Sequence, residues 1–543
     1  MGKNTQISFS AFNSLLNKSV PHILERIFLS LDYETFKSCL EVSTTWMEIL
    51  TSESFQKRAK SLFHEGISED KVKLWQKSYA GNAKTVKSLI LSGLLDVNHV
   101  QSDYVEKTLK PEKALTSLGV AASRGHKDVV KALLEKGAHL NKAHALALTP
   151  LQVSVSFGNK EVVQMLLDWG ADPNDNGEDR STVLHKAVIK GKTCLVALLL
   201  ERGAKPNVSA KKFGETPLHW AAQRGPANVV KLLLDRGANP NATDKDGKTP
   251  LSSTSSKTVA QLLLKRGADA DKGDKRGSTP LYWASLHGKK GVVDVLLQKG
   301  ANPNKPAKDG RTPLHSAIAY QYTFSQGDAK DVVQLLLDQG AEPNKPDNEG
   351  EYPLSLASMD GSKGVVEVLL QNGANPNVST KDGRTPLHCT VKKGVVDLTN
   401  VAKFKDVASL LLDHGAEINK KDRSGRTPLY LATEHCNDDL VSLLLQKGAK
   451  PDQSSNHGKT PLLCAIMNRS TEVVRLFLDY GADPNKGDRY GRTPLHYAIK
   501  NSRWDVVQLL LDKGADPKRA DKHGVTPLAL APGSDARKWL ARF

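Results

Sequence analysis

The stretch that decides the fold is residues 216–249, which read TPLHWAAQRGPANVVKLLLDRGANPNATDKDGKT. Thr216 can cap a helix, and Pro217 suits the first helical position, where a missing N–H costs nothing. Gly225 ends this short helix, a second aliphatic helix follows, and Gly237 supplies the left-handed residue that ends the second helix. The stretch therefore predicts two short helices and an exposed turn that leads to the next Thr-Pro.

The tetrapeptide Thr-Pro-Leu-His, or a near relative of it, recurs along the chain. Its first residue is Thr116, Thr149, Thr182, Thr216, Thr249, Thr279, Thr312, Tyr352, Thr385, Thr427, Thr460, Thr493 and Thr526. The intervals are 33, 33, 34, 33, 30, 33, 40, 33, 42, 33, 33 and 33 residues, and eight equal values show a true repeat. Two short helices cannot bury so broad an aliphatic face alone, so the units are expected to stack into a solenoid.

Four elements of the unit together resemble the ankyrin repeat: Thr-Pro-Leu-His, Val-Val-x-Leu-Leu-Leu, Gly-Ala-x-Pro-Asn and Asp-x-x-Gly. The resemblance implies an all-α solenoid with short β-hairpin-like turns. It covers residues 116–543 as about thirteen repeats, the last a shortened C-terminal cap in which Trp539 and Leu540 cover the open face. Residues 63–115 are expected to hold a degenerate first repeat and a connection, and no further segment is expected after the array.

The N-terminal part does not fit the repeat. We expect a tail at residues 1–17 and a module of three short helices at residues 18–62. So small a module leaves a large apolar surface for its core, because domains of this size are marginal alone. A binding partner is therefore implied.

This module resembles an F-box, in which a Leu-Pro-x-x-Ile-Leu-x-x-Ile-Phe-x-x-Leu opening precedes a Val-Cys-x-x-Trp stretch. The matching residues are Pro21, Ile23, Leu24, Ile27, Phe28, Leu31, Val42 and Trp46, and the departures are Val20, His22, Ser43, Phe55 and Gln56. The resemblance implies that Pro21, Ile23, Leu24, Ile27, Phe28, Leu31 and Trp46 contact the Skp-type adaptor of a cullin-RING ubiquitin ligase core, while the repeats hold a protein client. The alternative is a plain scaffold whose N-terminal helices only cap the solenoid.

Composition and motifs argue against an enzyme. The chain has no Walker loop, no H-E-x-x-H and no G-x-S-x-G motif, so we expect no catalytic residue and no cofactor. Five cysteines without a C-x-x-C pair indicate a reducing compartment, without disulfides or zinc. The longest aliphatic run is far shorter than a membrane span. These features predict an intracellular protein of the cytoplasm, the nucleus or both, without membrane attachment.

The tetrapeptide histidines are expected to form hydrogen bonds between units. They are His185, His219, His315, His388 and His496. A metal site would need several imidazoles and carboxylates within one small sphere, whereas these residues occur once per unit along a rod. We therefore predict no metal site.

Candidate client-binding residues lie where a unit departs from the average. Trp220, Trp283 and Tyr497 follow the tetrapeptide, where members of the resembled family often contact partners. The long intervals place insertions between the two helices, at residues 320–328 and 391–405, on one edge about 20 Å apart. The first insertion holds the aromatic residues Tyr320, Tyr322 and Phe324, a type favoured at binding hot spots. The alternative is that both insertions are neutral.

Basic residues recur at the exposed turns, and with a net charge of +17 they could line one ridge that attracts an acidic partner. They are Lys245, Lys248, Lys275, Arg276, Lys308, Arg311, Lys381, Arg384, Arg423, Arg426, Lys459, Arg489, Arg492 and Lys522, and Arg311 and Arg384 complete the client-binding candidates. Such turns are common in the resembled family, so solvated turn residues are the competing interpretation. Nucleic acid is not expected, because the aromatic content of 6% offers few stacking residues.

Overall fold

The computed structural model describes residues 77–78, 80–84, 86, 116–141, 148–176, 181–319, 326–391 and 398–543. The side chains of residues 326–328 and 398–401 are not described. The predicted three-helix module at residues 18–62 and the aromatic residues Tyr320, Tyr322 and Phe324 lie outside this part of the chain. The predicted degenerate repeat lies mostly outside it. Residues 1–238 and 239–543 form two compact units, which we describe separately.

The described part of residues 1–238 contains four helix pairs. They are α9 (Ser117–Arg124) with α10 (Lys127–Glu135), α11 (Pro150–Phe157) with α12 (Lys160–Asp168), α13 (Val183–Ile189) with α14 (Thr193–Glu201), and α15 (Pro217–Arg224) with α16 (Ala227–Asp235).

The described part of residues 239–543 contains nine helix pairs. They are α17 (Pro250–Ser253) with α18 (Lys257–Lys265), α19 (Pro280–Leu286) with α20 (Lys290–Gln298), α21 (Pro313–Ala319) with α22 (Gln326–Asp338), α23 (Pro353–Asp360) with α24 (Lys363–Gln371), α25 (Pro386–Cys389) with α26 (Leu398–Asp413), α27 (Pro428–Glu434) with α28 (Asp438–Gln446), α29 (Pro461–Met467) with α30 (Thr471–Asp479), α31 (Pro494–Lys500) with α32 (Trp504–Asp512), and α33 (Pro527–Leu530) with α34 (Gly533–Leu540).

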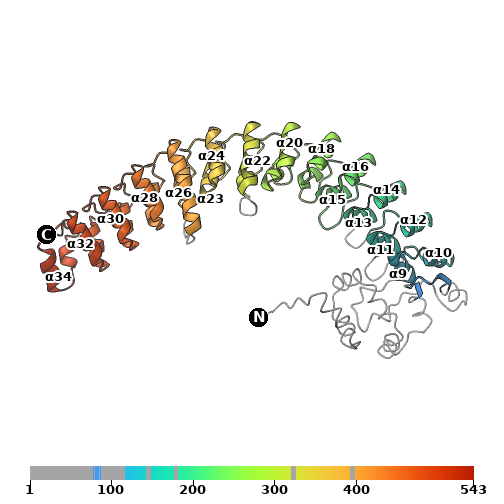
Figure 1. Ribbon diagram of the computed structural model, residues 1–543, viewed down its shortest axis with the longest axis horizontal. Coiled ribbons are helices and arrows are strands. Elements are labelled where there is room, and N and C mark those ends of the chain that lie inside the picture. Colours follow the sequence, from blue (N-terminus) through green and yellow to red (C-terminus); the bar gives the residue numbers. More distant parts are fainter. Residues whose placement is uncertain are drawn as a thin grey trace, which may run out of the picture. The chain divides into compact units, whose positions relative to one another are not determined.

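In both units, first helices pack on first helices and second helices on second helices. Figure 1 shows this for residues 239–543, where α18 to α32 stand side by side in chain order. Within the described residues there is no strand, and one isolated antiparallel bridge joins Asn176 and Thr182. The predicted all-α repeat stack is therefore confirmed.

The tetrapeptide sets where each first helix begins. Thr279 adopts an extended backbone and its side chain accepts a hydrogen bond from the N–H of Tyr282, while Pro280 occupies the first turn. This is the cap that the sequence predicts, since Thr satisfies an N–H that has no partner within the helix. Gly237 has a φ of 82°, as predicted for the residue that ends the second helix.

The tetrapeptide histidine links neighbouring units, as predicted. The N–H of Thr385 donates to Nδ1 of His388 at 3.1 Å, so the ring proton is assigned to Nε2. Nε2 in turn lies 3.1 Å from the carbonyl oxygen of Arg426 in the next unit. His185, His315 and His496 make the same contact with Glu215, Glu351 and Val525.

Asparagines in the Asn-Pro-Asn turns join one turn to the next. Asn304 Nδ2 donates to the carbonyl oxygen of Gly340 at 2.8 Å, and its Oδ1 accepts from the N–H of Glu342 at 2.7 Å. Asn344 and Asn377 repeat both bonds in the following units. This ladder holds the turns in register because each amide satisfies one carbonyl and one N–H of its neighbour.

Asn304→Ala is expected to loosen the turn of the next unit. Both side-chain bonds to Gly340 and Glu342 are lost, and water replaces them only partly, so the cost is about 1–2 kcal/mol. Hydrogen exchange at the Glu342 amide should become roughly tenfold faster. Lys299→Ala, a change at an exposed residue nearby, is the control, and equal acceleration in both variants would contradict the ladder.

The two insertions are partly helical, which corrects their predicted placement. Most second helices have nine residues, but α22 has 13 and α26 has 16, because residues 326–329 and 398–404 extend them at their N-terminal ends. In α26 the extension is anchored by Phe404, which is buried against Gly361 of the preceding unit. A Cβ atom at Gly361 would lie 3.0 Å from the Phe404 ring. The predicted junctions therefore overlap the second helices at residues 326–328 and 398–405.

The shortest interval carries Ser252, Ser253, Ser255 and Ser256, which are poor formers of a helix interior and predict a shortened first helix. The structure shows this helix, α17, with four residues. Helices of this length form one turn, and nucleation is costly. We expect the amides of residues 251–256 to exchange faster than the matching amides of α19. Hydrogen exchange measured by mass spectrometry checks this, and equal rates in the two helices would contradict it.

Candidate functional site

In several units, an aspartate five residues before the tetrapeptide accepts hydrogen bonds from N–H groups of its own turn. Asp488 Oδ1 accepts from the N–H groups of Tyr490 and Arg492 at 2.9 and 3.0 Å. Asp274 and Asp422 make the equivalent pair of bonds in their own units. The aspartate is buried because these N–H groups satisfy one carboxylate oxygen, which leaves Oδ2 for other side chains.

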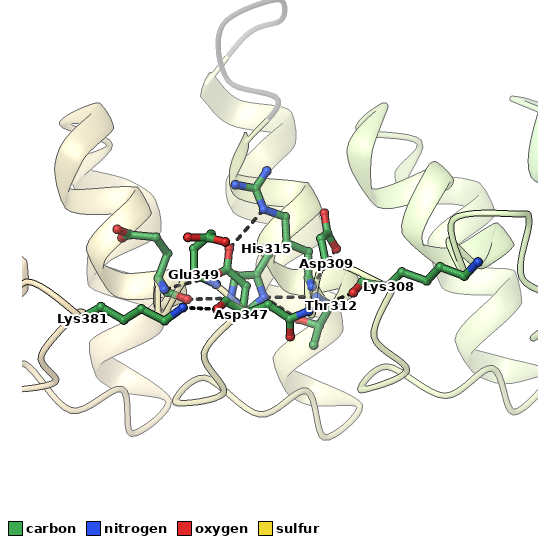
Figure 2. A network of polar contacts seen from close by, with 10 residues as sticks. Lys308, Asp309, Thr312, His315, Asp347, Glu349 and Lys381 are labelled. Atoms are coloured by element: carbon green, nitrogen blue, oxygen red, sulfur yellow. Dashed lines mark hydrogen bonds and ion pairs between the residues drawn. The ribbon is translucent and has the colours of Figure 1, made fainter.

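Figure 2 shows how successive turns interlock around Asp347. The N–H of Asn348 donates to the carbonyl oxygen of Asp309 at 2.9 Å, and Lys381 Nζ donates to the carbonyl oxygen of Asn348 at 2.6 Å. Thr312 and His315 lie between the two turns in the same view. The row of turns is thus a continuous, hydrogen-bonded surface.

The predicted aromatic candidates are held at their polar ends by turn carboxylates. Trp283 Nε1 donates to Asp274 Oδ2 at 3.0 Å, and the Tyr497 hydroxyl donates to Asp488 Oδ2 at 2.9 Å. Within residues 1–238, Trp220 Nε1 donates to the side chain of Glu215 at 2.6 Å. All three side chains are half-buried, so each ring is fixed in place with part of its surface open to solvent.

The ring of Trp283 contacts one lysine and one histidine. Lys248 Nζ lies 3.8 Å from a ring centroid of Trp283, and His287 stacks on the same side chain at 5.8 Å. A lysine at this distance is attracted by the negative face of the indole.

The two predicted arginines differ in their partners. Arg311 Nε donates to Asp347 Oδ2 at 3.2 Å, so it pairs with the aspartate of the next unit, because its own unit has Ala307 at that position. Arg384 is half-buried, and its Nε has no hydrogen-bond partner among the described residues. The structure therefore anchors Arg311 and leaves Arg384 Nε unsatisfied.

Three neighbouring units of residues 239–543 form a groove of about 310 Å³. Its lining includes Arg426 and Tyr430 from the first unit, Lys459 from the second, and Arg489, Tyr490 and Arg492 from the third. Glu434 and Asp488 supply its two carboxylates. The groove lies at the turns and first helices of its three units, and none of the predicted client-binding candidates is in its lining.

Arg492 packs between Tyr490 and Tyr497 at one wall of the groove, whose lining includes Arg492 and Tyr490 but not Tyr497. The guanidinium carbons of Arg489 and Arg492 lie 4.6 and 4.8 Å from the Tyr490 ring centroid. That of Arg492 lies 5.2 Å from the ring centroid of Tyr497. Arg492 also donates to Asp488 Oδ2 through Nε and Nη2 at 3.0 and 2.7 Å, and these two charge-assisted bonds to one oxygen hold it in place.

These contacts shift the pKa values of the wall. Burial alone would raise the pKa of Asp488, but the hydrogen bonds from Arg492 and Tyr497 outweigh it, and the pKa lies below its ordinary value. Burial, together with the Asp488 acceptor, raises the pKa of Tyr497 to about 12. At neutral pH the carboxylate is therefore charged and the phenol is protonated, which preserves the hydrogen bond between them.

The sequence pattern indicated Tyr497 as a client-binding candidate but did not indicate Tyr490. A signal was present, because Tyr490 stands in an exposed turn where every other unit from Thr249 onward carries a polar or charged residue. Tyr430 was also missed, since its place inside the tetrapeptide looks like a core position. Only the structure shows that both line the same groove.

The described residues show neither a metal-ligand cluster nor a membrane-spanning helix. Across them, no group of three or more His, Cys, Asp and Glu residues is arranged to hold a metal ion. Nor does any helix among the described residues have the length and apolar character needed to cross a membrane.

Comparison with protein families matches ankyrin repeats, as a model of three copies, to most of the chain. The matched residues are 74–177, 174–244, 251–325, 322–404, 398–455, 449–521 and 487–540. No F-box motif is detected. The search of curated proteins finds no match.

Proposed function

The chain belongs to the ankyrin-repeat family, whose members act in protein–protein interaction, and we propose that it is a substrate-recognition subunit of a Skp–cullin–F-box type ubiquitin ligase. In this proposal the repeats bind the client protein, and residues 18–62 bind the adaptor. Ubiquitin transfer belongs to the other subunits of the complex.

The observation that carries the client-binding part is the set of anchored aromatic side chains on the turn side of the first helices. Trp283 and Tyr497 are each held by a turn carboxylate while part of the ring faces solvent. A partner meets side chains that are already ordered, so little rotamer entropy is lost on binding. Aromatic residues in such positions contribute strongly to protein interfaces.

The adaptor-binding part is supported by sequence alone. Pro21, Ile27, Phe28 and Trp46 match the F-box pattern in identity and spacing, and the surrounding segment is too small to bury its own apolar residues. Ile27→Asp combined with Phe28→Asp is expected to abolish retention of a Skp-type adaptor by the full chain. Ile7→Asp combined with Phe9→Asp makes the same change in the predicted tail and should leave retention intact.

If the unmodified chain does not retain the adaptor, or if the Ile27 and Phe28 variant retains it, the ligase role is wrong. The repeats would then belong to a non-catalytic scaffold whose N-terminal helices cap the solenoid.

Client binding is tested separately with a photo-crosslinking amino acid in place of Trp283. The proposal expects crosslinked proteins to carry ubiquitin. Adding the Ile27 and Phe28 changes should leave crosslinking in place but remove the ubiquitin. Crosslinked proteins without ubiquitin in the unmodified background would support the scaffold instead.

A further inference from the structure

The groove of residues 426–492 carries more positive charge than its own contacts neutralise. Arg426 pairs with Asp422 and Glu434, and Arg492 pairs with Asp488. Lys459 and Arg489 also line the groove, and neither forms an ion pair with any residue that the structure describes. Two positive charges therefore face this groove without a carboxylate partner.

The exposed ring of Tyr490 lies beside the same positive charge. Two guanidinium groups lie within 5 Å of its centroid, and the Arg489 guanidinium donates to its hydroxyl. Arg492 is compensated by Asp488, whereas Arg489 is exposed and is not. A partner's carboxylate beside Arg489 would neutralise its charge. It would also place neighbouring apolar atoms of the partner against the Tyr490 ring.

We propose that this groove binds an acidic segment of the client protein, with carboxylate side chains on Lys459 and Arg489 and an adjacent side chain against Tyr490. The proposal rests on the proposed client-binding function and names the chemistry of the client. The volume of about 310 Å³ suits one or two side chains of an extended peptide.

The lining favours a peptide over a nucleic acid. Arg426 and Arg492 are already paired with Glu434 and Asp488, so only Lys459 and Arg489 remain for anionic groups, too few to follow a continuous run of phosphates. A peptide can place separate carboxylates next to Lys459 and Arg489 and neutral atoms next to the two acids. Electrostatic complementarity of this kind sets specificity and association rate.

The test is fluorescence polarisation with the full chain and a labelled peptide of alternating glutamate and serine. The same peptide with glutamine for glutamate and a labelled single-stranded DNA of similar length are compared. Lys459→Glu combined with Arg489→Glu should weaken glutamate-peptide binding at least about tenfold, because two attractive charges become repulsive. The control is Lys275→Glu combined with Lys308→Glu, which makes the same charge change at exposed turn positions of two other units, each equivalent to the position of Arg489.

The proposal expects binding of the glutamate peptide, much weaker binding of the glutamine peptide and loss in the Lys459 and Arg489 variant only. Absence of glutamate-peptide binding, equal loss in the control variant, or tighter binding of the DNA would overturn it. Circular dichroism confirms that both variants fold. Adaptor retention by the Lys459 and Arg489 variant is measured in parallel, so that a wrong groove assignment with intact adaptor binding is distinguished from failure of the ligase role.

Discussion

Asp488→Ala is expected to destabilise its unit by about 3 kcal/mol, which would be the largest effect of a single change at the groove. The side chain is 2% exposed and accepts bonds from two backbone N–H groups, from Arg492 and from the Tyr497 hydroxyl. Removing it leaves these donors without a partner in a partly buried site. The urea midpoint should fall, and amides of residues 488–500 should exchange faster.

Asp244→Ala is the matched control for this change. Asp244 Oδ1 accepts from the N–H groups of Asp246 and Lys248, which are the same two turn bonds. No arginine or tyrosine in the described part of the chain donates to Asp244, so the expected cost is only about 1 kcal/mol. Equal loss in both variants would show that Arg492 and Tyr497 gain nothing from Asp488.

As the pH falls, protonation of buried histidines is expected to lower the stability of the stack before the carboxylates become protonated. Burial lowers the pKa of His388 from 6.5 to about 4. A lowered histidine pKa means that the unfolded chain binds the proton more readily, so its stabilising effect is complete above pH 6.5 and is lost as the pH falls toward 4. Over that window the loss is about 3 kcal/mol for this residue.

The structure also explains why protonation of His388 is unfavourable in the folded protein. Its Nδ1 already accepts from the N–H of Thr385, so a proton there would face another donor. Burial also lowers the pKa of His315, so the same effect is expected in that unit.

The measurement is the urea midpoint between about pH 7 and pH 4.5. His388→Gln cannot titrate and should show a shallower fall with pH, although its stability at pH 7 is lower because the link to Arg426 is weakened. His457→Gln changes an exposed turn histidine and should leave the slope unchanged. A slope that is the same in all three proteins would contradict the assignment to His388.

Much of the fold could be predicted because its causes are local. The structure confirms the start of a helix at Thr216 and Pro217, the left-handed Gly237 and the shortened helix near Thr249. Each of these features depends on residues within one unit. Because the same pattern recurs, a correct prediction for one unit applies to the other units. The link from each tetrapeptide histidine to the next unit could be predicted for the same reason.

The candidate site could be predicted only in part. Trp283 and Tyr497 stood out from the repeat pattern, but the sequence does not say which carboxylate each would contact. The insertion at residues 391–405 was predicted as a junction, whereas residues 398–404 continue α26 because Phe404 finds a place against Gly361.

The sequence by itself determined the repeat, its two helices and the position of its core, since these follow from spacing within about 33 residues. The tertiary structure alone decided which charges are neutralised. Arg311 pairs with Asp347 of the next unit, Arg492 pairs within its own turn, and Lys459 and Arg489 face a shared groove. Such pairings depend on distances between side chains of stacked units, and those distances are set by how one unit packs against the next.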